Sequence, residues 1–229
     1  MSLRGELIPQ TPMRKAIARR MSDSKREAPH FYASTEIEMD AVAECLTKLS
    51  ESTGRRITAT AALIRACVLA LRENPRLNSI WTDDGLLQAA EINIGVAIAL
   101  DDGLIAPALL AADQLDLQAT AGALDDLGER ARAGKLRAPE VTDATFTLSN
   151  LGMFQVTSFS AIVTPPQVAI LATGRTMPRV VPGDHEPRIA SLMTATISVD
   201  HRALDGADAA RFLGTLKHTL EHPDDGLTG

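Results

Sequence analysis

The sequence predicts an α+β fold, a two-layer sandwich of a mixed β-sheet and helices. Helical and strand-like stretches both occur, but they do not alternate strictly as they do in a parallel α/β fold. The 229 residues, 45% hydrophobic and 23% charged, are also enough to bury a full core as one large domain. No internal repeat or low-complexity linker divides the chain. We therefore expect an N-terminal arm over residues 1–12 and a single domain over residues 13–229.

The first helix is predicted over residues 13–27, because Pro9 and Pro12 forbid a continuous helix before it and Pro29 ends it. Apolar residues recur at helical spacing on one face, namely Met13, Ile17 and Met21. Basic residues surround this face, namely Arg14, Lys15, Arg19 and Arg20. They favour a solvated or subunit-facing surface over a site for a polyanion.

An alternating strand is expected over residues 31–39, followed by helices from Asp40 to Gly54 and from Thr58 to Glu73. A hairpin turn is predicted at Asp83-Asp84-Gly85. A long alternating strand should follow over residues 92–100, closed by Asp101-Asp102-Gly103. The next strand, 104–110, contains Pro107 and should therefore lie at an edge or a bulge.

The second half of the chain is predicted to be rich in strands. A helix over residues 116–133 ends at Gly134. The expected strands cover residues 144–149, 158–163, 167–173 and 188–199. A last amphipathic helix is expected over residues 206–222.

Composition excludes several classes of function. A net charge of −6 leaves no basic surplus to neutralise nucleic-acid phosphates, and no apolar run reaches the roughly 20 residues that span a bilayer. Polar residues interrupt the N-terminus, so no signal peptide is expected. Cys45 and Cys67 lie in helical patterns and are interpreted as small core residues in a reducing compartment. We expect a soluble cytoplasmic protein with no metal site, since the histidines and cysteines lack ligand spacing.

The most informative stretch is 196–206. A strand-like run ends at His201, and Asp205-Gly206 opens the last helix. A histidine at such a corner can be held rigidly, and its ordinary pKa near 6.5 lets the neutral ring accept a proton. The alternative is a structural histidine with Asp205 as no more than a helix N-cap. Spacing alone favours that alternative.

A second informative stretch is Ser149-Asn150-Leu151-Gly152. A strand delivers a hydroxyl and an amide side chain into a glycine-containing loop. From the residues alone, a local turn stabilised by Ser and Asn side chains is the better interpretation.

Both stretches resemble motifs of the dihydrolipoyl acyltransferases, the catalytic cores of 2-oxo acid dehydrogenase complexes within the chloramphenicol acetyltransferase-like superfamily. His201-Arg202-Ala203-Leu204-Asp205-Gly206 is similar to their H-x-x-x-D-G signature, and Ser149–Phe154 to their S-N-L-G-M-F block. The match continues through Pro165-Pro166-Gln167 and covers about residues 7–222. Chloramphenicol acetyltransferases carry a second histidine where this chain has Asp200, which favours the first family and its pyruvate-type branch.

The resemblance implies transfer of an acyl group, acetyl in the first instance, between a dihydrolipoyl thiol and coenzyme A. Coenzyme A is then a substrate, and the lipoyl group comes from another domain or protein. His201 would be the general base and Ser149 the oxyanion donor. Asp205 would support the site through an ion pair with Arg14 or Arg19, and Gly206 would keep the corner free of a side chain. A thiol pKa near 8.5 makes the proton transfer only about two units uphill.

The resemblance also implies a homotrimer with active sites between subunits, served by a lipoyl domain in trans. The 2-oxo acid decarboxylase and dihydrolipoyl dehydrogenase components are further expected partners. Two alternatives stay open: a stand-alone coenzyme A-dependent acyltransferase with another acceptor, or a non-catalytic scaffold core. Acyl preference stays open too, because Gln155, Leu110-Ala111 and Thr60-Ala61 depart from the family pattern.

The residues after Pro223 bear on further assembly. They offer Leu227 as their one large apolar group beside Asp224 and Asp225. Burying a single leucine gives about 1.5–3 kcal/mol, which desolvation of neighbouring carboxylates would offset. Since family cores join trimers through an apolar tail, these residues predict an isolated trimer.

Overall fold

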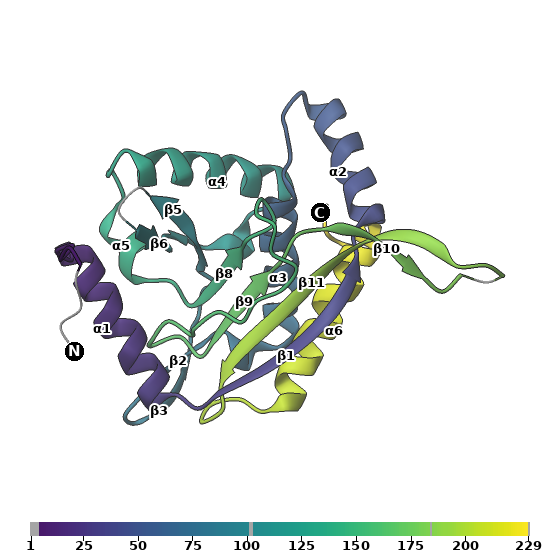
Figure 1. Ribbon diagram of the computed structural model, residues 1–229. Helices are drawn as coiled ribbons and strands as arrows, with labels where there is room; N and C mark the ends of the chain where they lie inside the picture. The colour runs from purple at the N-terminus through teal and green to yellow at the C-terminus, as the bar shows by residue number, and fades with distance from the viewer. Residues whose placement is uncertain (1–4, 101–102, 184, 229) are drawn as a thin grey trace.

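A computed structural model describes residues 5–100, 103–183 and 185–228 (Figure 1). Its central sheet is built from β1 (His30–Glu38), β4 (Ile94–Val96), β7 (Ala108–Leu109), β8 (Phe146–Asn150), β9 (Ala169–Thr173), β10 (Met177–Val181) and β11 (Arg188–Asp200). The strand order is β1-β11-β9-β8-β4-β7, and β10 pairs with β11. Strands β4, β8 and β9 are parallel and the other pairs antiparallel, so the predicted mixed sheet is confirmed.

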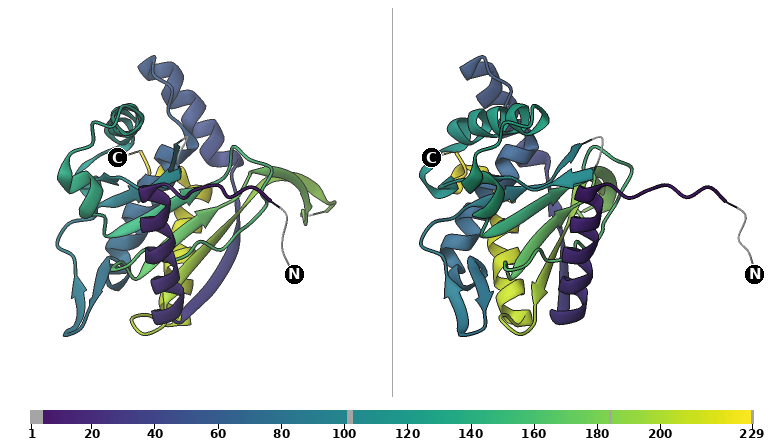
Figure 2. Two further views of the ribbon diagram at one scale, coloured as in Figure 1. Left: turned by 60° about the vertical axis from the view of Figure 1, so that its left-hand side comes forward. Right: turned by 90° about the vertical axis from the view of Figure 1, so that its left-hand side faces the viewer.

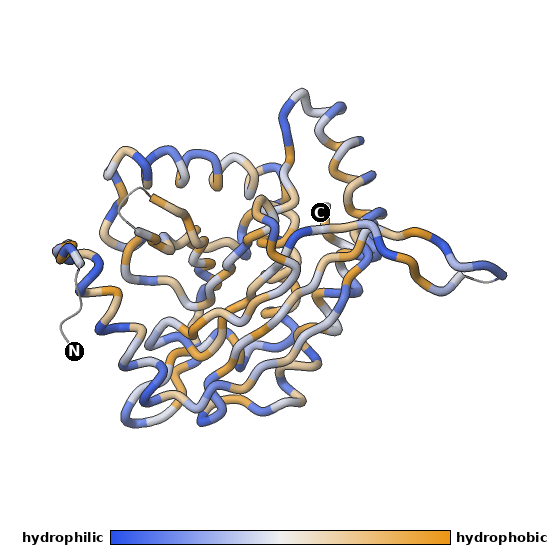
Figure 3. Tube along the Cα trace, in the orientation of Figure 1, coloured by the Kyte–Doolittle hydropathy of each residue, from blue (hydrophilic) through white to orange (hydrophobic). Residues whose placement is uncertain are grey.

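Six α-helices are found in the described residues: α1 (Pro12–Glu27), α2 (Asp40–Thr53), α3 (Ala59–Glu73), α4 (Leu117–Arg132), α5 (Ala138–Thr142) and α6 (Gly206–Glu221). Helices α3 and α6 contact each other and cover one face of the sheet (Figures 1 and 2). On this face Phe146 of β8 packs against Phe212 of α6, with ring centroids 5.4 Å apart. Hydrophobic residues follow the central strands, whereas hydrophilic residues recur along α2 and α4 (Figure 3). The α+β prediction is therefore confirmed.

Strand alternation on β8 separates the core from the opposite face. Phe146 and Leu148 are fully buried in the core. Because successive side chains of a strand point to opposite faces, Thr147 and Ser149 face the other side, where α1 lies. Helix α1 begins at Pro12, one residue earlier than expected, since proline is tolerated in the first helical position and Thr11 caps it through Arg14 N.

The predicted strand over residues 92–100 is wrong as a single element. It divides at Ala97 into β4 of the central sheet and β5 (Ile98–Leu100), which pairs with β6 (Gly103–Ile105) in a separate two-stranded sheet. The predicted strand over residues 104–110 is also wrong as a single element, since it divides around Pro107 into β6 and β7. The part after the proline, β7, lies at the edge of the central sheet, where an edge position was expected. Asp101 and Asp102, expected to close the strand, lie outside the described residues.

The predicted strand over residues 158–163 is also wrong. This segment is an irregular loop between β8 and β9. Its apolar Val163 is buried because side chains hold its backbone: Ser24 Oγ donates to Val163 O (2.6 Å), and Val163 N donates to His30 Nε2 (3.0 Å). Helix α5 and strand β10 were not predicted.

The hairpin prediction is confirmed. Strands β2 (Ser79–Thr82) and β3 (Gly85–Gln88) form the predicted hairpin around Asp83 and Asp84. Cys67 is a fully buried core residue, as expected, and burial raises the pKa of its thiol. The same expectation is wrong for Cys45, which is only partly buried. In the described part of the chain, no helix has the length and apolar character needed to cross a membrane.

Leu227 packs into the core of its own chain and has no exposed surface. It follows the short 3₁₀ turn η3 (Pro223–Asp225), and its backbone N donates to Pro223 O. The leucine that we considered as a contact to a neighbouring trimer is thus already used within the chain.

Glu140 anchors α5 and yields a first prediction. Its carboxylate is 1% exposed and accepts bonds from Arg130 Nη1 (2.5 Å) and from Arg137 N (2.7 Å). These bonds, that from Arg130 above all, lower the pKa of Glu140 from 4.5 to about 2. A depressed carboxyl pKa stabilises the fold above the unfolded-state value and loses that effect as pH falls toward 2.

We expect Glu140→Gln to destabilise the protein by about 3 kcal/mol at neutral pH, a difference that shrinks between pH 4.5 and 2. Urea unfolding across this pH range measures the effect. The exposed Glu129→Gln serves as the matched control and should unfold like wild type. A pH-independent loss of stability in Glu140→Gln would contradict the assignment.

Candidate active site

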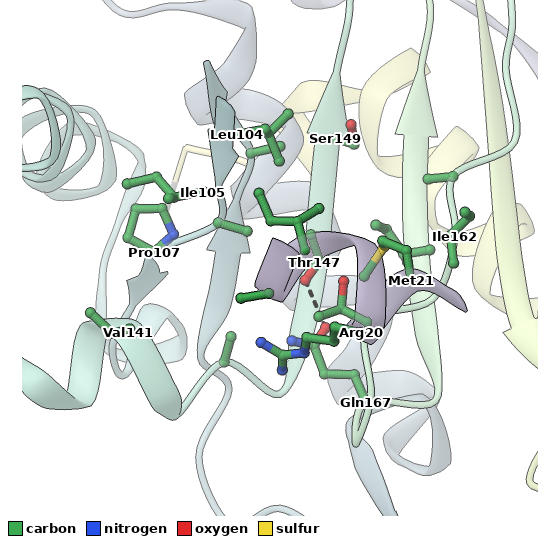
Figure 4. Close-up of a pocket in the computed structure, with 18 of the residues that line it drawn as sticks. Arg20, Met21, Leu104, Ile105, Pro107, Val141, Thr147, Ser149, Ile162 and Gln167 are labelled. Carbon is green, nitrogen blue, oxygen red and sulfur yellow. Dashed lines mark hydrogen bonds between the residues drawn. The ribbon is translucent and has the colours of Figure 1, made fainter. Parts of the chain in front are cut away.

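Ser149 opens onto a cavity of about 530 Å³ between α1 and the sheet (Figure 4). Apolar side chains form most of its walls, among them Met13, Ile17, Met21, Leu104, Ile105 and Ile162. The first three are the apolar face that the sequence predicts for the first helix. That face therefore covers a hollow beside a hydroxyl rather than a closed core.

The two hydroxyl groups of β8 in this cavity differ in their partners. Thr147 Oγ1 donates to Gln167 Oε1 (2.7 Å), a bond drawn in Figure 4. In the part of the chain that the structure describes, Ser149 Oγ makes no hydrogen bond. Its hydroxyl is consequently available to donate to a bound molecule.

Asn150, the neighbour of Ser149, is committed to the turn. Its Oδ1 accepts from Gly152 N (2.8 Å) and its Nδ2 donates to Thr60 Oγ1 (3.1 Å). The interpretation as a local turn is therefore right for Asn150 but not for Ser149. Thr60, which binds Asn150, and Gln155 are two of the departures from the family pattern. Gln155 lies in the loop after Ser149 and accepts a bond from Arg175.

His201 lies at the predicted corner after β11. Its backbone N donates to Pro29 O (2.9 Å), and its ring lies edge-on to Phe31, with centroids 5.4 Å apart at 74°. The residue is exposed. A Cβ at Gly206 would lie 3.3 Å from the Phe31 ring, so a side chain there would press on the residue that contacts the His201 ring. Gly206 thus leaves the corner free of a side chain, as expected.

Asp205 is the N-cap of α6. Its Oδ1 accepts from Ala207 N (2.8 Å) and Asp208 N (3.0 Å), and Asp208 Oδ2 accepts from Asp205 N in return. These backbone bonds lower the pKa of the Asp205 carboxyl. The expected ion pair with Arg14 or Arg19 is not formed within the described chain, where Asp205 Oδ1 instead accepts from the N-terminal amides of α6. As the N-cap, Asp205 fixes where α6 begins, four residues after His201.

Ser149 and His201 are far apart within one chain. Ser149 pairs with Ala172, and Ala172 pairs with Thr196, which precedes His201 by five residues. Five residues of strand span about 16 Å and two strand spacings about 10 Å, so the two residues lie roughly 19 Å apart. No proton or acyl transfer can involve both residues of the same chain.

Sequence reasoning missed three further groups at the site. His30 donates from Nδ1 to Ala28 O (2.8 Å) and accepts at Nε2 from Val163 N, so its neutral ring holds the cavity loop. Gln167 Oε1 accepts the hydrogen bond from the Thr147 hydroxyl. Arg202 lies over the Trp81 ring. For Gln167 and Arg202 the signal was their presence in the matching motifs, to which no role was given.

Comparisons with known proteins agree on the family. The model of the 2-oxoacid dehydrogenases acyltransferase (catalytic domain) family matches residues 4–228. The acetyltransferase component of the Rhizobium meliloti pyruvate dehydrogenase complex is 39% identical over 225 residues, which is 95% of this chain and 50% of that protein. The chain thus spans half the length of this relative.

Solved structures show the same relationship. The dihydrolipoamide acetyltransferase of Azotobacter vinelandii superposes with a TM-score of 0.91 at 30% identity, over 97% of this chain and 93% of that one. The catalytic mechanism of that enzyme was investigated through a serine, a histidine and an asparagine. A chloramphenicol acetyltransferase shares the fold alone, with a TM-score of 0.54 at 12% identity over 88% of this chain and 94% of that one. The chain belongs to the family of 2-oxoacid dehydrogenase acyltransferase catalytic domains.

Proposed function

We propose that this domain transfers an acetyl group between coenzyme A and a dihydrolipoyl thiol, the lipoyl group being supplied by another domain or protein. The observation that carries the proposal is the Ser149 hydroxyl, which faces the cavity with no hydrogen-bond partner in the described chain. A donor held in this way suits an oxyanion that exists only during reaction.

The reaction requires no covalent acyl-enzyme. Neutral His201 takes the proton of the incoming thiol, and the thiolate attacks the thioester carbonyl carbon. Ser149 Oγ–H donates to the oxyanion of the tetrahedral intermediate. When the intermediate collapses, the carbon–sulfur bond to the first carrier breaks, and the imidazolium returns its proton to the departing thiolate.

A two-substrate assay tests the proposal. The protein is mixed with acetyl-CoA and free dihydrolipoamide, and mass spectrometry follows coenzyme A and S-acetyldihydrolipoamide, which should form in equal amounts. Consumption of acetyl-CoA only with a different acceptor would instead support a stand-alone acyltransferase. No transfer to any acceptor would support a scaffold core.

We further propose that the working unit is a homotrimer in which His201 of one chain serves Ser149 of its neighbour. The separation of roughly 19 Å within one chain supports this arrangement. The N-terminal arm also supports it: it extends away from the body (Figure 2), and its Leu7 and Ile8 are 89% and 81% exposed. In this proposal a lipoyl domain reaches the site in trans. The decarboxylase and dihydrolipoyl dehydrogenase components of a 2-oxo acid dehydrogenase complex are the partners of the assembly.

Mixing two inactive variants tests the shared site. His201→Ala and Ser149→Ala chains, unfolded and refolded together in equal amounts, should regain activity that neither has alone. Half of the chains can supply the histidine and half the serine, so about one quarter of wild-type activity is expected from random trimers. Steady-state turnover measures the gain.

The control mixes His201→Ala with the double variant, which lacks both residues and should restore nothing. A refolded mixture of the two single variants that stays inactive while eluting as a mixed trimer would show that each site lies within one chain.

A further inference from the structure

The residues on either side of His201 form a closed ion pair. Asp200 is 2% exposed, and its carboxylate accepts four hydrogen bonds from Arg202: from the backbone N (3.0 Å), from Nε (3.0 and 3.1 Å) and from Nη2 (2.6 Å). A guanidinium that meets a carboxylate through two nitrogens defines an orientation as well as a charge contact. The backbone of His201 is therefore enclosed between two side chains that bind each other.

The outer face of this ion pair is covered by an aromatic ring. The guanidinium carbon of Arg202 lies 4.6 Å from the centroid of the Trp81 ring, a cation–π distance. Trp81 is itself anchored, because its backbone N donates to Pro166 O (2.7 Å). The hairpin of β2 and β3 thus holds Arg202 from a part of the sequence more than a hundred residues away.

His201 needs such an anchor. Among the described residues its imidazole makes no hydrogen bond and only lies edge-on to Phe31. Its direction thus depends on the backbone of the corner, which Asp200 holds through Val168 O and Leu204 N as well. A small rotation there would move the ring nitrogens by more than a productive proton transfer allows.

We propose that Arg202, clamped between Asp200 and Trp81, is a positioning residue that orients His201 for catalysis. This inference rests on the proposed function, because it assigns Arg202 a role in the same acyl transfer. Arg202 touches neither thioester nor thiol in this proposal. Its effect on turnover passes entirely through His201.

The kinetic test uses Arg202→Ala, Arg202→Lys and Trp81→Ala. Arg202→Ala should lower kcat about 10- to 100-fold with KM for acetyl-CoA within about twofold, because binding does not depend on the direction of the imidazole. Arg202→Lys keeps the charge but not the two-nitrogen contact, and should recover only part of kcat. Trp81→Ala should act in the same direction with a smaller effect.

A double-variant comparison separates positioning from general damage. In a His201→Ala background, Arg202→Ala should cause no further loss of the residual turnover, because nothing remains to be oriented. An equal fold-loss in both backgrounds, or an unchanged kcat in Arg202→Ala, would overturn the inference. Arg55→Ala is the matched control, since Arg55 pairs with Asp125 of α4 (3.2 Å) away from the corner and should leave kcat unchanged.

A spectroscopic readout is independent of turnover. In protein labelled with ¹³C-histidine, the His201 signal is identified by its absence in His201→Ala. It should be a single line in wild type and should broaden or divide in Arg202→Ala. An unchanged line would overturn the inference even if wild type transferred no acyl group, whereas an inactive wild type by itself contradicts only the proposed function. Should Arg202→Ala fail to fold, the kinetic and NMR measurements are made on Arg202→Lys and Trp81→Ala instead.

Discussion

Replacing His201 with alanine is expected to lower kcat by about 10²–10⁴-fold while the thioester still binds. The motif assigns deprotonation of the thiol to the His201 ring. His201 does not line the cavity beside Ser149 of its own chain, so the substitution removes the base without changing the apolar walls that each chain provides. Steady-state turnover with acetyl-CoA and dihydrolipoamide gives kcat, and equilibrium dialysis gives the binding of acetyl-CoA.

His185→Ala is the matched control for this variant. His185 is exposed on the connection between β10 and β11, far along the chain from the corner, and its loss should leave kcat at the wild-type value. Near-normal turnover by His201→Ala would remove the general base from the mechanism. A large rise in the dissociation constant with unchanged kcat would assign His201 to substrate binding instead.

The second large effect is expected for Ser149→Ala, which should lower kcat by about 10²–10³-fold with little change in KM. The physical reason is that the hydroxyl has no partner in the described chain and gains one when the carbonyl oxygen becomes an oxyanion. The loss corresponds to one oxyanion donor, about 3–4 kcal/mol of transition-state stabilisation. Alanine leaves β8 intact, because the backbone of Ser149 still pairs with Ala172.

Ser158→Ala tests whether any serine in this region would behave in the same way. Ser158 is exposed in the irregular loop before β9, so Ser158→Ala should leave kcat and KM unchanged. A KM effect at constant kcat in Ser149→Ala would indicate binding of the ground-state thioester and contradict the oxyanion assignment.

The sequence by itself determined most helices and, through its resemblance to a known family, the candidate site residues. Helix ends depend on local groups that a sequence displays, such as Thr11 before Pro12, Gly54 after α2 and the carboxylate of Asp205. His201 and Ser149 were recognisable for the same reason, because each lies within a short motif whose residues are neighbours along the chain. The structure places both at the ends of the strands that the sequence predicts for them.

Only the tertiary structure decided how the strands pair and what the site residues contact. Apolar and small residues alternate over 92–100 in the same way whether the segment joins one sheet or two. In the structure, residues after Ala97 pair with β6 rather than with the central sheet. Residues 158–163 look like a strand because apolar residues alternate there, up to Val163. Val163 is buried, yet the partners of its backbone are the side chains of Ser24 and His30. A pattern of burial does not reveal which groups bury a residue.

The same limit applies to the site. Asp205 was expected to pair with an arginine, but its carboxylate accepts hydrogen bonds from the backbone amides of its own helix. The wide separation of Ser149 and His201 follows from the register of β8, β9 and β11, and the clamp on Arg202 from the hairpin that carries Trp81. Local propensity is a property of neighbouring residues, whereas register and long-range contacts arise only when distant segments share one core.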